Sequence, residues 1–552
     1  MADYIKFTKE KLKYLVGDVK KLIPKITSGK GTPPLEVLSE GEIYLQLDES
    51  DISTSGYDEF FESYFKLQRT GKIYGTKIWK SAINPTSLCE KTRDNIGLVC
   101  KPSTDSVEAQ DDYADIPLFK WYECNYKRYD DGFAYPTAML GDSAYATSGP
   151  VDCGALQMTF YYKYIDNDSY TELVISDSPN NALGLEPWPL AVRSDGTVKS
   201  YFAQSRYNSS IGIDGLLRSL PNQKIARNQS HNTQVTDYQK KGKGHWGSGS
   251  NRYSFAQIFS QIKFGTKDIQ SVMQGCTGWS IQYKASIQSE DKNTYFPVTT
   301  AQANNLYVGA YVSVGYGRYD NSTLNLDREI GTIHSYADDV KILKKETIDS
   351  NNVAIYLDCE PFNTKSITDS SGNTLDIYMS SMHSRTGATD VVIGHHDGSP
   401  VSNTNAIFPC RIQGIEYFCG AYIVASDTVM FFNSDYSKDV YYAPRGVSHT
   451  TDESKIKSTY TKIGTIPANS DGKGNDYWIG DVTIKNGVWY PSSQIDTQNS
   501  YKDRIYAGGA NTSGSREYLH GGHLGFGSDA GLAFLHCWSW LGMSYWAIAS
   551  AD

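Results

Sequence analysis

The sequence predicts an α+β fold that is rich in β-strands, and three observations support this class. Short runs of alternating apolar and polar residues fill most of the chain, and clusters of Gly, Asn, Asp and Ser separate them. Only two segments show clear helical periodicity. The 41 Tyr and 48 Gly residues are typical of extended structure with many turns. With 552 residues, of which 39% are hydrophobic, the chain is long enough for two or three packed domains.

An amphipathic helix followed by a linker is predicted at the N-terminal end. Apolar side chains recur on one helical face within residues 7–23, and Pro24 follows them. Residues 28–34 have the composition of a linker. The first thirty residues hold eight Lys and three acids, a net charge of +5 (8 − 3). We expect residues 1–35 to attach the protein to an assembly or to oligomerise it, and a solvated helix face is the alternative.

The rest of the chain is predicted to be mostly β-structure. We expect a β-rich leading region over residues 36–210, with one strand-like run at 157–164. The second helical segment is Tyr253–Phe264. A meander over about 306–379 predicts a small β insertion. Its strands are expected at 307–314, 329–334, 340–343 and 353–358.

Charge and cysteine content narrow the function classes. The net charge of −10 argues against nucleic acid as a partner, because phosphate binding needs a basic face. The nine Cys residues show no CxxC spacing, so free thiols are expected rather than a disulfide framework or a zinc site. No apolar run follows Met1, so no secretory signal is expected. A surface-binding protein without such a signal suits a virion part that is assembled in a bacterial cytoplasm and released by lysis.

Three segments together resemble the formylglycine-generating-enzyme-like branch of the C-type lectin fold. The first runs from Ser219-Leu-Pro-Asn to Lys241-Gly-Lys-Gly-His-Trp246 and the following helix. The second is Arg411–Gly420, which contains Gly-Ile-Glu, and the third is the glycine-rich stretch Gly521–Leu532. This branch occurs in tailed-phage proteins and in variable proteins of diversity-generating retroelements. Tyr417 stands where the family commonly has Asn, and aromatic residues replace its usual Asn- and Ser-rich ending.

The resemblance implies a C-type-lectin-like module over residues 211–552 and a role as a phage receptor-binding protein of a tail or head fibre. It also implies a homotrimer that binds a glycan or protein on the host bacterial surface and contacts other virion proteins through its N-terminus. The family's ligand-binding segment corresponds to Gly521–Asp552. In retroelement-diversified relatives this ending varies by adenine-directed mutation, and Asp529, His536 and Tyr545 are residues that such mutation yields from Asn codons.

The C-terminal segment Ala530–Ala549 contains no charged residue and permits three interpretations. It is long enough for a membrane anchor, but it lacks a Lys or Arg flank and holds His536 and several Ser residues. A buried core strand is the second interpretation, and the alternation of Ala530, Leu532 and Phe534 fits it. We favour the third, a contact surface, because Trp and Tyr dominate binding sites. The predicted ligand-binding residues are His523, Leu524, Phe526, Asp529, His536, Trp538, Trp540, Met543, Tyr545 and Trp546.

Other candidate sites are weaker. The sequence His395-His396-Asp397 has metal-binding chemistry, but its glycine flanks favour a polar turn. Asp111-Asp112 and Asp338-Asp339 are expected in solvated loops. Cys537, which lies among aromatics rather than cations, does not suit the copper-dependent oxidase chemistry of the family's enzymes. No HExxH, GxSxG or P-loop pattern occurs. We therefore expect no catalytic residue, no metal and no cofactor.

The predicted function is binding of a host cell through the aromatic C-terminal segment. Aromatic stacking on sugar rings or in protein pockets would supply the contacts, and repeated copies would add avidity. Two alternatives remain. One is a glycan-degrading spike enzyme, and the other is a purely structural virion decoration protein in which the aromatic segment is buried between subunits.

Overall fold

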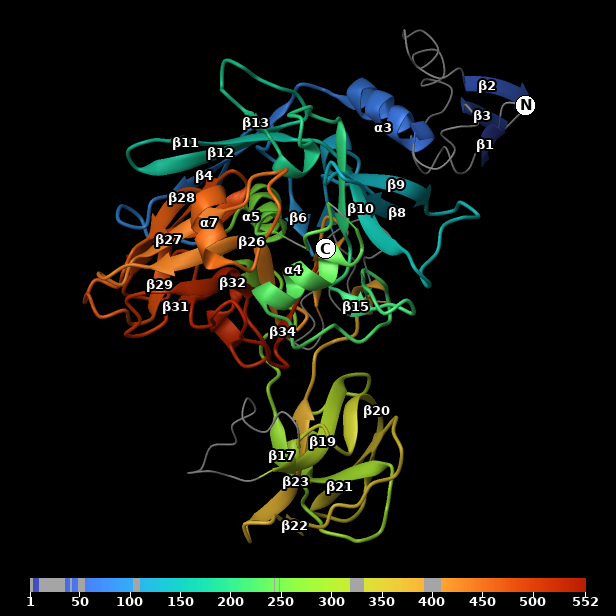
Figure 1. Ribbon diagram of the computed structural model, residues 1–552, viewed down its shortest axis with the longest axis vertical. Helices are drawn as coiled ribbons and strands as arrows, with labels where there is room; N and C mark the ends of the chain where they lie inside the picture. The colour runs from blue at the N-terminus through green and yellow to red at the C-terminus, as the bar shows by residue number, and fades with distance from the viewer. Residues whose placement is uncertain are drawn as a thin grey trace.

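The computed structural model describes residues 3–8, 35–39, 42–47, 55–102, 110–242, 244–247, 249–317, 332–391 and 409–552. Strands far outnumber helices within these ranges, which confirms the predicted β-rich class. Figure 1 shows a large body and a smaller β unit joined to it by two stretches of chain. The helix predicted over 7–23 lies outside the described residues, except for its first two residues, which end strand β1 (Asp3–Thr8).

The largest sheet of the described chain contains nine strands and places the C-terminal segment. Its order is β28-β27-β26-β32-β33-β31-β29-β30, and β34 pairs with β26. The strands are β26 (Tyr422–Phe432), β27 (Lys438–Tyr442), β28 (Thr461–Ile466), β29 (Tyr477–Lys485), β30 (Val488–Ile495), β31 (Arg504–Tyr506), β32 (Ser515–Gly521), β33 (Gly531–His536) and β34 (Ile548–Ala549). β33 is antiparallel to β32 and parallel to β31, so it lies inside the sheet rather than at an edge.

Smaller sheets complete the body. A four-stranded sheet contains β14 (Tyr201–Ser205), β10 (Asp152–Met158), β8 (Trp121–Arg128) and β9 (Ala134–Met139). A five-stranded sheet contains β13 (Glu186–Pro187), β11 (Tyr161–Asp166), β12 (Tyr170–Ser176), β4 (Ile73–Trp79) and β5 (Glu90–Arg93). Short pairs join β6 (Cys100–Lys101) to β7 (Gln110–Asp111), β15 (Ser210–Ile211) to β16 (Leu217–Arg218), and β24 (Cys410–Ile412) to β25 (Ile415–Tyr417). Near the N-terminus, β3 (Glu42–Leu47) pairs with β1 and β2 (Leu35–Ser39).

The run 157–164, expected as one strand, is divided between two sheets. Its first residues belong to β10 and its last to β11, and the chain leaves the first sheet at Thr159 and Phe160. Both residues are fully buried, so the bend lies inside the core. An alternating pattern cannot show this break, because the residues on either side keep the same period of two.

Helix α5 (Asn251–Phe264) lies at the centre of the body and matches the predicted helix Tyr253–Phe264. Residues 251–263 are all buried, as expected for a helix that neighbours enclose on every side. Phe160 of the leading region packs on Phe255 and Phe259, with ring centroids 6.1 and 5.3 Å apart. Residues before and after position 210 therefore share one hydrophobic core.

Helix α3 (Ser55–Gln68) was not predicted, although its pattern is helical. Tyr57, Phe60, Phe61, Tyr64 and Phe65 recur at helical spacing and are all buried. Aromatic residues have only modest helix propensity, and the same residues also favour strands. The remaining α-helices of the described ranges are α4 (His231–Gln239), α6 (Thr300–Ala303) and α7 (Glu453–Thr459). The 3-10 turns among the described residues are Pro117–Phe119, Pro189–Ala191, Ile269–Ser271, Ala388–Val391 and Gly527–Asp529.

The smaller unit is a β insertion with its own core. It holds β17 (Gln282–Lys284), β18 (Tyr295–Thr299), β19 (Tyr311–Gly317), β20 (Ala337–Thr347), β21 (Asn352–Leu357), β22 (Ile367–Thr368) and β23 (Thr374–Ser381). The sheet thus begins before residue 306, because β17 and β18 pair with the distant strands β23 and β21. Of the strand expected at 329–334, residues 329–331 lie outside the described residues. Residues 332–334 form a turn instead of a strand.

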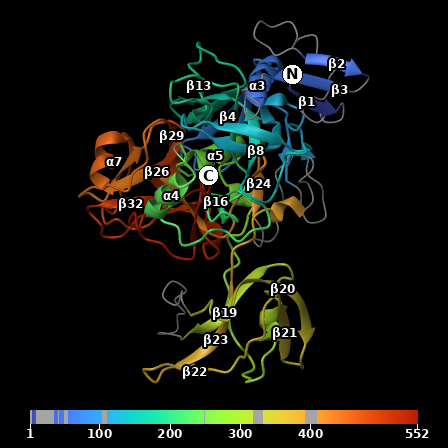
Figure 2. The ribbon, with the colours of Figure 1, turned by 45° about the vertical axis from the view of Figure 1, so that its right-hand side comes forward.

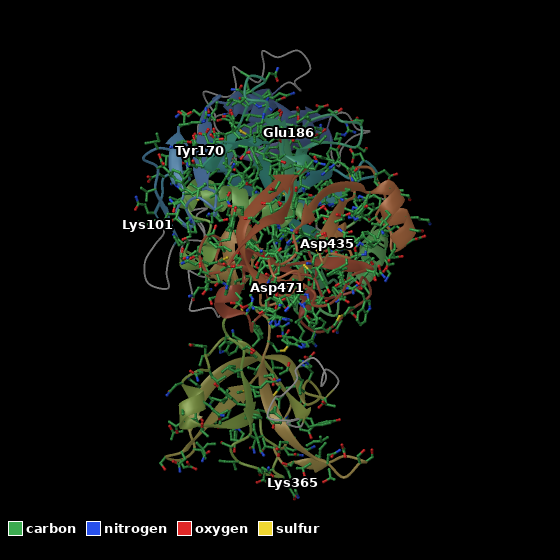
Figure 3. All side chains as sticks on the ribbon, turned by 90° about the vertical axis from the view of Figure 1, so that its left-hand side faces the viewer. Lys101, Tyr170, Glu186, Lys365, Asp435 and Asp471 are labelled. Atoms are coloured by element: carbon green, nitrogen blue, oxygen red, sulfur yellow. The ribbon has the colours of Figure 1, made fainter. Side chains whose placement is uncertain are left out.

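The two units are well separated along the long axis of the molecule (Figures 1 and 2). Lys365 lies at the end of the insertion farthest from the body, whereas Tyr170 and Glu186 lie in the opposite part of the molecule (Figure 3). A cluster that includes Phe296, Val312, Ile355 and Met379 forms the core of the insertion, separate from the main core of the body.

The Gly-Ile-Glu segment forms a hairpin that ties the insertion to the body. Gln413 and Gly414 both have positive φ, 50° and 77°, as a two-residue hairpin turn requires. The buried Glu416 carboxylate accepts hydrogen bonds from the Gly387 N–H (2.9 Å) and from the N–H and hydroxyl of Thr389 (3.1 and 2.7 Å). Gly387 and Thr389 belong to the stretch of chain that returns from the insertion to the body.

Candidate binding surface

Strand β33 fixes the C-terminal segment within the large sheet. Ala530, Leu532 and Phe534 are at most 2% exposed, as the core prediction requires. Ala533 and Leu535 are buried as well, so both faces of the strand are covered. Helix α5 covers one of them, and the Gln257 side-chain amide donates to the Leu532 carbonyl at 2.8 Å.

The glycine-rich stretch before β33 is a tight turn that requires glycine at two positions. Gly521 and Gly522 have φ values of 84° and 82°. A Cβ atom at Gly521 would lie 2.5 Å from the Tyr253 hydroxyl, and one at Gly522 would lie 2.8 Å from the Ala530 Cβ. The turn therefore packs closely on α5 and on itself, and it carries His523 and Phe526.

Half-buried aromatic side chains gather around the buried Tyr422 of β26. Its ring centroid lies 5.0 Å from those of His523 and His536, 5.6 Å from Phe526 and 6.4 Å from Tyr545. We call His523, Phe526, His536, Tyr545 and Tyr506 the aromatic cluster; each is partly exposed. Tyr506 of β31 contacts Phe526 at 4.8 Å. The fold thus brings together four predicted contact residues from separate stretches of the C-terminal segment.

Asp529 lies at the edge of the aromatic cluster and is held by two partners. Its carboxylate accepts a hydrogen bond from the Tyr506 hydroxyl (3.2 Å) and pairs with the Arg504 guanidinium (3.3 Å). It is partly exposed, so it remains a candidate contact residue.

Trp538 and Trp540 are the most exposed members of the predicted set, at 50% and 60%. They follow β33 in extended chain, where every second side chain points to the same side. The residues that alternate with the two tryptophans, Cys537, Ser539 and Leu541, are buried. The backbone is anchored on both sides, because the Cys537 N–H donates to the Tyr506 carbonyl and the Asn232 N–H to the Leu541 carbonyl, each at 2.9 Å. Met543 follows and is half-buried.

Two predicted contact residues, Leu524 and Trp546, are buried rather than at the surface, contrary to the expected exposure. Leu524 is 1% exposed because it packs against Gly420, where a Cβ atom would lie 2.8 Å from its side chain. Trp546 is 2% exposed because the chain turns inward before β34. Its ring stacks on His383 with centroids 5.1 Å apart, next to the chain that returns from the insertion.

Burial determines the protonation of this region. Burial lowers the pKa of His523 to about 4 and that of His536 to about 3, so both imidazoles are neutral at pH 7. Burial also raises the pKa of the Cys537 thiol to about 12, so this sulfur stays protonated and is a poor nucleophile. All nine cysteines lie in described ranges and are free thiols.

The other candidate sites have structural roles or cannot be placed. His395-His396-Asp397 lies outside the described residues, and the described ranges contain no cluster of metal-binding side chains. The acidic pairs expected in solvated loops are instead bonded. The buried Asp111 side chain pairs with Lys263 at 2.7 Å, and Asp339 is only 7% exposed. Among the described residues there is no helix long and apolar enough to cross a membrane.

Three residues of the aromatic region were missed by sequence reasoning. Tyr422, Tyr506 and Arg504 come from β26 and β31, which long-range strand pairing brings to the C-terminal segment. β31 pairs directly with β33, whereas β26 pairs with β32 and β34. The sequence contains no local signal for such pairing. No family model matches the chain, and no curated protein matches it.

Proposed function

We propose that this protein is a tailed-phage virion adhesin that binds a bacterial surface ligand through its C-terminal aromatic residues. The observation that carries the proposal is the exposure of Trp538 and Trp540 on an anchored backbone that directly follows β33 and His536 of the aromatic cluster. Large apolar side chains in such a group mark interaction sites, and Trp is enriched among the residues that contribute most to binding.

The surface is suited to binding sugar rings or an apolar protein epitope. Both tryptophans offer flat apolar faces, and their anchored backbone reduces the entropy that binding would otherwise cost. The aromatic cluster adds partly exposed rings, and Asp529 with Arg504 adds polar groups at its edge. A neutral glycan or a protein fits this composition.

The proposal extends to the whole virion part. The body would be a C-type-lectin-like module, consistent with its β-rich sheets and with the three sequence motifs. Residues 1–35 would contact other virion proteins, and a homotrimer would multiply a weak single site through avidity. Placement in a tail or head fibre rests on the sequence resemblance alone.

The test replaces Trp538 and Trp540 by Ala and measures adsorption of assembled virions to host cells. Each truncation at a binding centre typically costs at least 2 kcal/mol, so we expect adsorption to fall by about tenfold or more. Ile213, which is 89% exposed, supplies the matched control, and Ile213→Ala should leave adsorption unchanged.

Three outcomes would contradict the proposal. Lost assembly with unchanged adsorption per particle would assign the tryptophans to a subunit interface and favour a structural decoration protein. Unchanged assembly and adsorption would show that the surface is not used. Shortened chains after incubation of the protein with host polysaccharide would replace binding alone by enzymatic degradation.

A further inference from the structure

A cleft of about 820 Å³ separates the body from the insertion. The body lines it with Ile211 and residues 222–227, and the insertion lines it with Tyr311, residues 339–341 and Asp358. Arg385, on the chain that returns from the insertion, completes the lining. The volume is within the range of sites that enclose small ligands, about 300–1,000 Å³. The aromatic cluster and the exposed tryptophans do not line this cleft.

Ion pairs across the junction hold the two walls in place. The Arg227 guanidinium of the body pairs with Asp338 of the insertion. The Arg385 Nη2 donates to the Asp339 carbonyl at 2.8 Å, and its Nη1 lies 3.4 Å from the Asp339 Oδ2. These contacts preform the cleft, so a ligand need not first bring the two units together.

The lining is basic although the whole chain is acidic. Four of its side chains are cationic and two are anionic, a net charge of +2 (4 − 2), or +1 (4 − 3) when the Asp338 partner of Arg227 is included, against −10 for the whole chain. A concave site with an excess of one charge concentrates ions of the opposite charge. The cations are Lys224, Arg227, Lys341 and Arg385, and the anions are Asp339 and Asp358.

The two lysines retain donors for an incoming anion. Lys224 of the body is exposed and donates one hydrogen bond, to the Asp338 carbonyl at 2.6 Å. Lys341 of β20 is also exposed, and its ammonium group has no hydrogen-bond or ion-pair partner within the described part of the chain. Because an ammonium group has three donors, both lysines can bind a further oxygen. They come from opposite sides of the junction.

The remaining lining groups suit the hydroxyls and ring of a sugar. Asn222 and Gln223 contribute side-chain amides. Asp358 contributes an exposed carboxylate that can accept hydrogen bonds from sugar hydroxyl groups. Tyr311 contributes a ring, with the Arg385 guanidinium 4.8 Å from its centroid. We infer that this cleft binds an acidic saccharide, and that Lys224 of the body and Lys341 of the insertion contact its carboxylate groups.

The test uses the full chain and titration calorimetry with a trigalacturonate probe, a neutral galactotriose and inorganic phosphate. We expect trigalacturonate to bind, and we expect galactotriose and inorganic phosphate to bind at least about tenfold more weakly. Lys224→Glu and Lys341→Glu should each weaken trigalacturonate binding by about tenfold or more, because each reverses a contacting charge. Lys292→Glu is the matched control. Lys292 is an exposed lysine of the insertion outside the cleft, and its variant should bind within about twofold of the parent.

Several results would overturn the inference. Equal binding of the neutral trisaccharide would remove the role of the charge, and equal binding of inorganic phosphate would remove the role of the sugar. An equal loss in the Lys292→Glu variant would show nonspecific attraction. The Trp538→Ala and Trp540→Ala variants should bind trigalacturonate normally, so failure of the adhesin proposal and failure of this inference give different results.

Discussion

Trp538 and Trp540 are exposed for a local reason that begins with their spacing. Separated by one residue in extended chain, they occupy the same side, and Cys537, Ser539 and Leu541 occupy the other. The same argument fails at Trp546, six residues after Trp540, because the chain has turned and this ring is buried against His383. Residue type therefore predicted a contact surface, but the path of the backbone decided which aromatic residues are exposed.

The histidines of the aromatic cluster lead to a prediction about pH. Burial lowers the pKa of His523 to about 4 and of His536 to about 3, from an ordinary value of about 6.5. Because the folded-state pKa is lowered, the neutral forms stabilise the fold above pH 6.5, and this contribution is lost as pH falls toward 4 and 3. Host binding should therefore be constant between pH 5.5 and 8 and weaken only at about pH 4.

The measurement is equilibrium binding to host envelopes over that pH range, compared with the His536→Phe variant. A loss of binding with a midpoint near pH 6.5 in the parent but not in the variant would contradict the prediction. It would mean that His536 is solvated and titrates normally.

At the scale of elements, helix α3 shows how aromatic residues can form a helix. Phe61 is fully buried and packs on Phe65 and on Tyr201 of β14, with ring centroids 5.7 and 6.1 Å apart. Hydrogen bonds support the contact, since Glu62 accepts from the Ser200 N–H at 2.8 Å. Tertiary packing thus outweighs the modest helix propensity of these side chains.

Phe61→Ala should destabilise the body through a cavity beneath α3. Removal of a buried Phe side chain costs about 3–5 kcal/mol. Leu67→Ala on the same helix is the control. Leu67 is 37% exposed, so its replacement should change stability by about 0.5 kcal/mol or less. Urea unfolding followed by tryptophan fluorescence measures both, and equal effects of the two variants would contradict the assigned orientation of α3.

At the scale of the whole molecule, the body and the insertion are structurally distinct units. Each has its own hydrophobic cluster, and the chain passes between them only twice (Figure 1). The Arg227–Asp338 and Arg385–Asp339 pairs connect them, together with the packing of Tyr311 and His334 against the body. These local contacts couple the units more weakly than a shared core does.

We therefore predict two unfolding transitions. Hydrogen exchange under increasing urea should show the insertion, 282–381, and the body opening at different denaturant concentrations. Val312→Ala, in the core of the insertion, should lower only the urea concentration at which the insertion opens. Ile258→Ala in α5 should lower only the urea concentration at which the body opens. A single transition that both variants shift equally would show that the two units fold as one.

Much of the fold could be predicted from local patterns, and the errors have physical causes. The β-rich class, α5 and the core positions Ala530, Leu532 and Phe534 follow from periodicity, which is a local property. The β insertion was placed too narrowly because β17 and β18 are defined by distant partners. The break between β10 and β11 also escaped prediction, because a chain can change sheets without changing its period.

The sequence by itself determined that this is a β-rich protein whose uncharged, aromatic C-terminal segment is its most distinctive region. Only the tertiary structure decided which of those aromatic residues face solvent, and that β26 and β31 contribute Tyr422 and Tyr506 beside them. It also created the basic cleft, from residues more than a hundred positions apart. The reason is that composition and spacing fix local conformation, whereas exposure and neighbours depend on how distant strands pair and on which surfaces that pairing leaves open.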